Sequence, residues 1–320
     1  MLNNRSELLF LYDIQWANPN GDPVDENKPR IDEETGKNIV TDVRLKRTIR
    51  DYLHEYCGQE IFVREIADEN EHIQDAKLRA EDFLIQNGEK VDKSKVSLVE
   101  MKSIINEQVL NDCIDVRLFG VTLPIEKSNK EKSSITHTGP VQFKMGQSLH
   151  AVKLEYIKGT GAFASGSKMS QKTFREEYVL PYSLISFYGI INESAAKYTR
   201  LTEEDIQFML EAMWNGTKSL ISRSKAGQIP RLLMRVVYKE NHFQIGELDK
   251  YVSLHSEKLD EEIRDVNDYV LDVTALVQLL EKYKDRIERV ELVQDERLVC
   301  SENLFESLTS KGLTVERKEF

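Results

Sequence analysis

Apolar and polar residues alternate along the chain in blocks that predict a mixture of strands and helices. Residues 7–16 (ELLFLYDIQW) are apolar and aromatic, as in a buried strand, and the turn-rich NPNGDP at 18–23 ends that run. Residues 178–191 and 231–238 have the same strand composition. Because proline donates no ladder hydrogen bond, Pro181 predicts that its strand begins there or lies at a sheet edge.

Two segments have the spacing of amphipathic helices. The first, 41–56, is capped by Thr41 or Asp42, and its apolar face comprises Leu45, Ile49, Tyr52, Leu53 and Tyr56. The second begins at Thr202, and Asp205 three residues later forms a capping pair with it. Its apolar face comprises Ile206, Met209, Leu210, Met213 and Trp214, and Asn215-Gly216 predicts a stop or a kink.

The remaining segments complete the order of elements. Residues 58–116 are polar, acidic and mostly helical in pattern, whereas 127–134 (KSNKEKSS) predict an exposed, mobile loop. Residues 153–172 are rich in Gly and Ser between apolar segments, which predicts a long hairpin with a flexible tip. The tail predicts a helix over 273–287, a strand near 290–293, and a short helix and strand after Asn303. This order is compatible with an α+β, ferredoxin-like (split βαβ) domain that carries large insertions.

Composition narrows the class of protein. With 320 residues, 40% hydrophobic and 31% charged, the chain is expected to be a soluble globular protein of one large or two ordinary domains. It contains no apolar run of about 18 residues and no signal-peptide pattern at its start, so we expect a cytoplasmic protein. Its three cysteines lie far apart, without CxxC or HExxH, and predict neither a disulfide framework nor a zinc site.

The distribution of charge along the chain is more informative about binding partners than the net charge. The net charge of −11, taken alone, argues against a polyanionic partner, because phosphate binding needs cations. Between residues 216 and 239, however, every charged side chain is basic: Lys218, Arg223, Lys225, Arg231, Arg235 and Lys239. Residues 144–175 carry several cations against Glu155 alone. Since the local potential steers a ligand, an acidic protein can still carry a basic face.

The first predicted helix is a candidate phosphate-binding element. Lys46, Arg47 and Arg50 project from the arc opposite its apolar face, with Arg44 at the edge. Guanidinium groups match phosphate oxygens, and lysine supplies a point charge. The alternative is a solvated surface in which these cations pair with nearby aspartates.

Two loops offer further candidates, each with a plain alternative. The segment 222–228 (SRSKAGQ) has the composition of a phosphate-contacting loop in Arg223 and Lys225, or is simply a helix-to-strand connection. In the glycine-rich hairpin, Phe163 and Met169 are apolar residues that could wedge against nucleobases or fold back onto the core. Its GTGAFA is not a dinucleotide fingerprint, because no helix opens after it.

Carboxylates and histidines suggest little catalysis. Asp13, Asp22 and Asp25 lie near the end of the first strand and could hold a divalent metal, but their Asn, Gly and Pro neighbours favour turn roles. His137 and His150 have no evident nucleophile or metal partner in the sequence.

Taken together, the motifs resemble a known family. They are, in order, NPNGDP at 18–23, PR at 29–30, VTDVRLKRTIRDY at 40–52, DVRLFG at 115–120, TGPVQF at 138–143, WNGT at 214–217, RSK at 223–225 and PR at 230–231. The set resembles the repeated backbone subunit of type I CRISPR Cascade complexes (the Cas-seven family), in the form found in subtype I-B. The resemblance runs from about residue 8 to 238.

The resemblance implies a single RNA-binding palm over 1–320, of ferredoxin-like (RRM-like) fold. It implies a finger-like insertion at 58–135, a thumb hairpin at 153–172 and a C-terminal extension at 247–320. Copies would stack head to tail on the guide RNA, beside other Cascade subunits and the target DNA strand, with no catalysis and no cofactor. The RNA-binding residues it implies are Thr41, Arg44, Lys46, Arg47, Arg50, Phe163, Lys168, Met169, Arg223 and Lys225. The alternative is a metal-dependent ribonuclease of the type III kind, with Asp13, Asp22 or Asp25 as its carboxylate.

Overall fold

The computed structural model describes residues 2–67, 73–128, 131–164 and 172–320. Its strands are β1 (Ser6–Ala17), β2 (Gly21–Asp22), β3 (Lys28–Ile31), β4 (Lys37–Val40), β5 (Ile85–Gln86), β6 (Glu89–Lys90), β7 (Gly120–Ser128), β8 (Glu131–Thr138), β9 (Val141–Phe143), β10 (Gly146–Ala151), β11 (Glu155–Ala164), β12 (Lys172–Ile191), β13 (Ile229–Tyr238), β14 (Ser253–His255), β15 (Val270–Asp272), β16 (Ile287–Gln294) and β17 (Val315–Arg317). Its α-helices are α1 (Asp42–Glu55), α2 (Ala76–Glu81), α3 (Leu98–Asp112), α4 (Ile114–Phe119), α5 (Glu193–Thr199), α6 (Glu203–Lys218), α7 (Thr274–Lys282) and α8 (Leu304–Ser310). Short 3-10 helices occur at η1 (Leu248–Tyr251), η2 (Asp260–Glu262), η3 (Val266–Asp268) and η4 (Lys284–Arg286).

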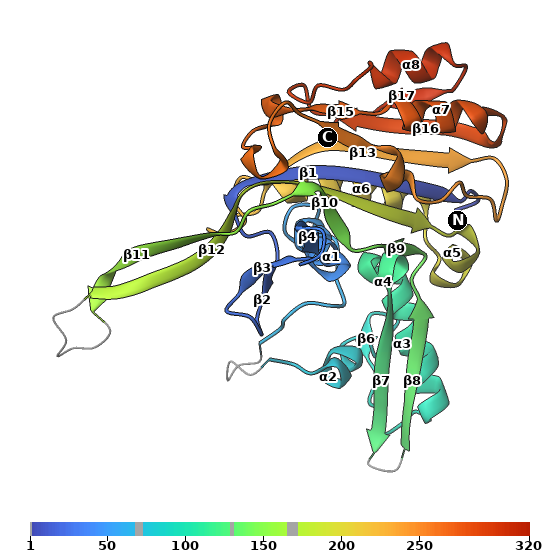
Figure 1. Cartoon of the computed structure of the whole chain (residues 1–320). Helices are drawn as coiled ribbons and strands as arrows, with labels where there is room; N and C mark the ends of the chain where they lie inside the picture. Colours follow the sequence, from blue (N-terminus) through green and yellow to red (C-terminus); the bar gives the residue numbers. More distant parts are fainter. Residues whose placement is uncertain (1, 68–72, 129–130, 165–171) are drawn as a thin grey trace.

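One large sheet organises the molecule (Figure 1). Its strands follow the order β17-β16-β13-β1-β12-β10-β4-β3-β2, and β9 and β11 also pair with β12. β1 lies at the centre, antiparallel to both β12 and β13. The chain is therefore mixed α/β around a mostly antiparallel sheet.

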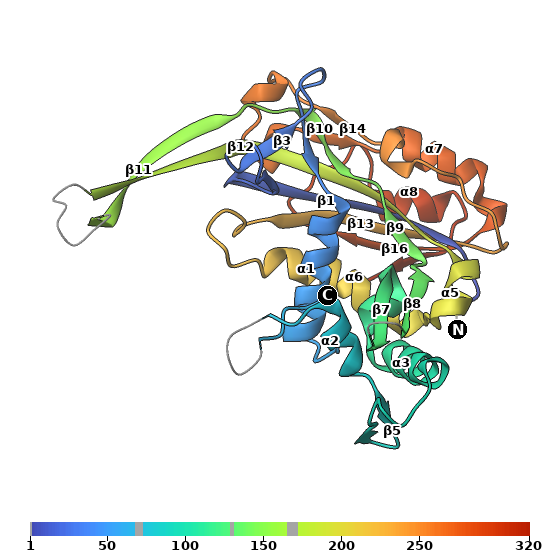
Figure 2. The same cartoon turned by 90° about the horizontal axis from the view of Figure 1, so that it is seen from below.

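Both faces of β1 are buried, which explains its almost unbroken apolar sequence. Even-numbered residues from Leu8 to Ile14 pack with α1 and α6 in one hydrophobic cluster. Leu9 and Leu11 pack in a second cluster with the C-terminal elements, including α7 and α8. Figure 2 shows α1 and α6 on one side of the sheet and the C-terminal elements on the other.

The caps of the two main helices are confirmed. Thr41 caps α1, and Thr202 forms a capping box with Asp205 at the start of α6. Of the stop or kink predicted at Asn215-Gly216, the stop is wrong, since α6 continues to Lys218. Gly216 instead allows close packing on α1, because a Cβ there would lie 2.9 Å from the Cβ of Tyr52.

The insertion between α1 and β9 has its own small core, which includes Phe62, Phe83, Met101 and Ile105. Helices α2, α3 and α4 confirm part of its predicted helical pattern, and the hairpin β5–β6 lies among them. The loop predicted at 127–134 is wrong for its described residues, which belong to strands, although most of them are exposed as predicted. Both its flanks are strands of the hairpin β7–β8, in which Ile125 and Ile135 are buried.

A second hairpin, β11–β12, projects from the sheet as predicted for 153–172 (Figure 1). The prediction that Pro181 begins a strand is wrong, because β12 runs through it, but the alternative of an edge position is confirmed locally. Pro181 falls after β11 pairing ends at Val179 and before β10 pairing begins at Ile185. Its missing N–H therefore interrupts no ladder on that side.

No helix in the described part of the chain is both long enough and apolar enough to span a membrane.

Candidate nucleic-acid interface

The NPNGDP loop at 18–23 is ordered by hydrogen bonds that also position the start of α1. The Asn20 Oδ1 accepts hydrogen bonds from the backbone N–H and the hydroxyl of Thr41, both at 2.9 Å. Arg30 donates to the carbonyls of Asn20 at 3.1 Å and of Gly21 at 2.7 Å. The side-chain amide of Asn18 donates to the carbonyl of Asn27, beyond this loop, at 2.6 Å. The hydroxyl of Thr41 is thus engaged within the protein.

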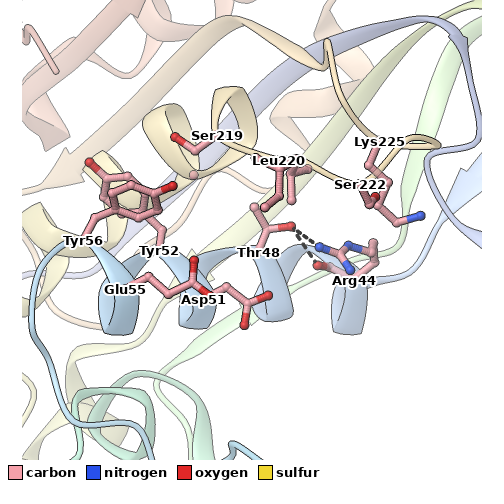
Figure 3. A pocket seen from close by; sticks show the side chains of 12 residues that line it. Arg44, Thr48, Asp51, Tyr52, Glu55, Tyr56, Ser219, Leu220, Ser222 and Lys225 are labelled. Atoms are coloured by element: carbon pink, nitrogen blue, oxygen red, sulfur yellow. Dashed lines mark hydrogen bonds between the residues drawn. The ribbon is translucent and has the colours of Figure 1, made fainter.

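A groove of about 250 Å³ separates α1 from the segment that follows α6 (Figure 3). Arg44 and Lys225 lie together at one end of it, although they are far apart in sequence. Arg44 donates to the Thr48 hydroxyl at 2.9 Å, and the Lys225 ammonium donates to the Asn18 carbonyl at 3.3 Å. Within the described residues, neither has a carboxylate within ion-pair distance. We call Arg44 and Lys225 the cation pair.

The electrostatics of the cation pair favour an added anion. Burial, and then the positive charge of Arg44, hold the pKa of Lys225 below its usual value. Burial also lowers the pKa of Arg44, with Asp51 opposing that shift. Two partly desolvated like charges repel each other, so a phosphate placed between them would relieve the repulsion of both.

The far end of the groove has a different character (Figure 3). Tyr52 and Tyr56 stack with ring centroids 5.1 Å apart beside Glu55. The prediction that Tyr56 belongs to the packed face is wrong, because it follows the last helical residue and is 60% exposed.

The other predicted cations of α1 are paired. The expectation that Arg50 projects freely from the outer arc is wrong: its side chain is 13% exposed and contacts the buried carboxylate of Asp115 at 2.9 Å. Lys46 bonds to Asp42 at 3.0 Å, and Arg47 to Asp51 at 2.8 Å. Of these three, Arg47 is the most exposed.

Arg223 links the second predicted loop to the base of the β11–β12 hairpin. Its guanidinium contacts Glu177 at 2.6 Å, and the neighbouring Ser224 carbonyl accepts a hydrogen bond from the Asn18 N–H at 3.0 Å. The sequence-predicted wedge and its lysine, Met169 and Lys168, lie outside the described residues. Phe163 belongs to β11 by its backbone, and its side chain is outside the description.

Two arginines of the basic 216–239 stretch belong to the core. Arg231 bonds to Asp13 at 2.8 Å and to Asp295 at 2.5 Å. Arg235, with 1% of its side chain exposed, bonds to Ser6 at 3.0 Å and also contacts Glu203 and Glu291. The basic stretch is therefore not one continuous basic face.

The aspartates of the ribonuclease alternative have structural partners. Asp13 is buried, and it also accepts a hydrogen bond from Tyr182 at 2.7 Å. Burial raises the pKa of Asp13 despite the nearby guanidinium of Arg231. Asp22 accepts from the Val24 N–H at 3.0 Å, and Asp25 pairs with a lysine of the same turn. No cluster of three metal-ligating side chains occurs among the residues that the structure describes.

The histidines have polar-contact roles. His137 lies 2.6 Å from the Asn106 side chain, and the buried His150 contacts the carbonyls of Ala151 and Asp260. Burial lowers the pKa of His150.

Several motif residues hold the scaffold in ways that the sequence did not predict. Asp115 accepts from the N–H of Phe62 at 2.8 Å as well as from Arg50. Gly120 and Gly139 allow close backbone contact, since a Cβ on Gly139 would lie 2.1 Å from the Phe119 carbonyl carbon. The motifs themselves marked these positions, but only the fold supplies their partners.

Comparison with known proteins identifies the family. The model of the family described as CRISPR-associated protein Cas7 matches residues 4–274. The chain belongs to the Cas7 family. A curated relative from Haloferax volcanii, named CRISPR-associated protein Cas7, is 36% identical over 310 residues, covering 92% of this chain and 88% of the relative.

Solved structures agree with the family at the level of the fold. A chain of a "CRISPR RNA-guided surveillance complex, pre-nicking" is similar with a TM-score of 0.52 and 12% identity, covering 96% of this chain and 99% of that one. A chain of another "CRISPR RNA-guided surveillance complex" gives a TM-score of 0.51, also at 12% identity, with 99% and 95% coverage.

Proposed function

We propose that this Cas7 protein is a guide-RNA-binding backbone subunit of a type I surveillance complex. In this role it supports pairing between the guide and a target DNA strand in antiviral defence. Membership of the Cas7 family carries the proposal, through the match over residues 4–274 and the 36% identical relative. From the resemblance of its motifs we further propose the subtype I-B form, and we propose that the protein acts in the cytoplasm.

The proposed palm is ferredoxin-like. The order β1, α1, β10, β12, α6, β13 along the chain, with β13-β1-β12-β10 as neighbours in the sheet, supports this assignment. Residues 58–135 would be the fingers, the β11–β12 hairpin around 153–172 the thumb, and 247–320 an extension of the palm.

The cation pair would bind the RNA backbone. Arg44 and Lys225 converge on one groove from two segments that the sequence singled out separately. Arg47 and Arg223 would add charge around it, because exposed ion pairs are worth about 0–1 kcal/mol and exchange readily for a phosphate. Lys46 would add charge from a less exposed pair with Asp42.

Two of the expected RNA-binding residues would instead act through the scaffold. Thr41 fixes the start of α1 and Arg50 neutralises Asp115. In the thumb, the wedge formed by Phe163 or Met169, with Lys168 beside it, stays a prediction from the family resemblance.

Assembly follows from the geometry of a repeated subunit. Head-to-tail contact is heterologous and does not close, so copies build a filament whose length the guide sets. Catalysis is not part of this role, and the pairing of Asp13 with Arg231 supports that view.

Co-expression with a guide RNA tests the proposal. The purified protein should retain RNA of the guide length, and its ratio of nucleic-acid absorbance to protein absorbance should be well above that of protein alone. The Arg44→Gln/Lys225→Gln variant should lose most of it, whereas Lys282→Gln, on the exposed side of α7, should not. Protein that folds, yet carries no RNA and binds none at low salt, would refute the proposal.

A further inference from the structure

Trp16 combines exposure with an unusual backbone. Its side chain is 54% exposed, and its φ of 47° lies in the left-handed region. A bulky residue rarely adopts that conformation, which costs roughly 1–2 kcal/mol, and such outliers concentrate at functional sites. The other tryptophan, Trp214, is only 4% exposed, so exposure is a property of this position and not of the residue type in this chain.

The left-handed backbone at Trp16 changes which side chain at the end of β1 enters the core. Along β1, Ile14 packs in the cluster with α1 and α6, and Gln15 points to the other face, where it donates to the Arg264 carbonyl at 2.9 Å. Simple alternation would bury Trp16 next. Instead Ala17 joins the Ile14 cluster and Trp16 remains outside. The chain thus accepts backbone strain to keep a large aromatic ring at the surface.

Trp16 is also two residues from a contact of Lys225, and in the sheet it is close to the base of the β11–β12 hairpin. Two residues later, the Asn18 carbonyl accepts the hydrogen bond from Lys225 at 3.3 Å, and two residues of chain span at most about 7 Å. In the sheet, Gln15 pairs with Tyr182 and Ala17 with Leu180, so Trp16 lies between these pairs, next to the root of the β11–β12 hairpin.

We propose that Trp16 stacks on a base of the RNA strand whose phosphates the cation pair holds. This inference rests on the proposed function and adds a base contact to it. Aromatic stacking suits a guide-binding subunit, because every base has a π-face and the contact tolerates any sequence. Stacking at this point would let the protein bind the base through β1 and the phosphate through the cation pair.

Intrinsic fluorescence tests the proposal directly, because the chain has only two tryptophans. In the Trp214→Phe variant all indole emission comes from Trp16. Titration with an oligouridylate of about six nucleotides, within the range that one single-strand-binding domain covers, should quench that emission in step with binding followed by anisotropy of a labelled oligonucleotide. The Trp16→Phe variant, in which only Trp214 emits, should show binding without quenching.

Affinity provides the second measurement. Trp16→Gly should weaken binding of the same oligonucleotide about 5- to 100-fold, and Trp16→Phe should retain most of the affinity. The slope of log Kd against log salt should stay unchanged in both, since stacking releases no counterions. Glycine adopts a positive φ without strain, so the melting temperature of Trp16→Gly should not fall enough to account for the loss.

The outcomes separate the two claims. Binding with normal affinity in Trp16→Gly, and no quenching of Trp16, would overturn the stacking contact and leave the proposed function standing. Loss of assembly on long RNA, with unchanged binding of the short oligonucleotide, would also overturn it and assign Trp16 to the contact between copies. Absence of RNA binding by the unsubstituted protein would overturn the proposed function together with this inference.

Discussion

The cation pair makes a quantitative prediction about salt. Replacing Arg44 and Lys225 by glutamine removes two cations that have no carboxylate partner among the described residues. Each phosphate contact to a single strand contributes about 0.7 to the slope of log affinity against log salt, so the double substitution should lower that slope by about 1.4. Between about 50 and 200 mM salt, the unsubstituted protein should therefore lose about sevenfold more affinity than the variant.

Fluorescence anisotropy with a labelled guide, over that range of salt, measures both slopes. Lys282→Gln removes one exposed cation on α7 and serves as the control, with an expected slope equal to that of the unsubstituted protein. A double variant with an unchanged slope, or a control with an equally reduced one, would contradict the placement of phosphate at the cation pair.

Three further predictions concern stability. Arg50→Met should lower the free energy of unfolding, measured by urea titration, by about 2–4 kcal/mol, because it leaves the fully buried Asp115 without its cation. Arg47→Met breaks an exposed pair and should change that free energy by less than about 1 kcal/mol. Equal effects of the two substitutions would mean that Arg50 is not a scaffold residue. Asp13→Ala should lower the free energy of unfolding by about 2–4 kcal/mol, because the buried Arg231 loses one of its two carboxylate partners. The same variant should leave a complementary RNA as intact in magnesium as it is with the unsubstituted protein, and cleavage that Asp13→Ala abolishes would restore the ribonuclease alternative. Lys225→Met should raise the melting temperature of the RNA-free protein at neutral pH. The pKa of Lys225 is lowered in the folded state, so its charged form costs stability below that pKa, and the gain from the substitution should shrink as the pH rises toward the unfolded pKa of about 10.5. A loss of stability at neutral pH would contradict this reasoning.

Local patterns in the sequence predicted the elements whose signals are local. β1, α1, α6 and β13 follow from apolar runs, helical spacing and caps within a few residues of each boundary. Gly216 shows the limit of such reasoning. Asn-Gly is a helix-ending signal by itself, whereas in the fold Gly216 lies within α6 and allows the close approach of Tyr52 from α1.

The candidate site was harder to predict, because charge pairing depends on contacts between distant residues. Arg50 and Asp115 are separated by 65 positions and Arg231 and Asp13 by 218, so no local pattern distinguishes these buried cations from the cation pair. Arg44 and Lys225 were both candidates, yet their convergence follows only from the packing of the 219–228 segment beside α1. The exposure of Trp16 could not be predicted, because it lies within a predicted buried strand and the composition does not indicate its left-handed backbone.

The length dependence of assembly tests the central claim most directly. Complexes formed on guides of increasing length should be weighed by native mass spectrometry. If the protein coats guide RNA as a repeated backbone subunit, the number of copies per complex should rise linearly with guide length, in steps of one copy for a fixed number of added nucleotides. A copy number that stays constant as the guide grows would contradict the account.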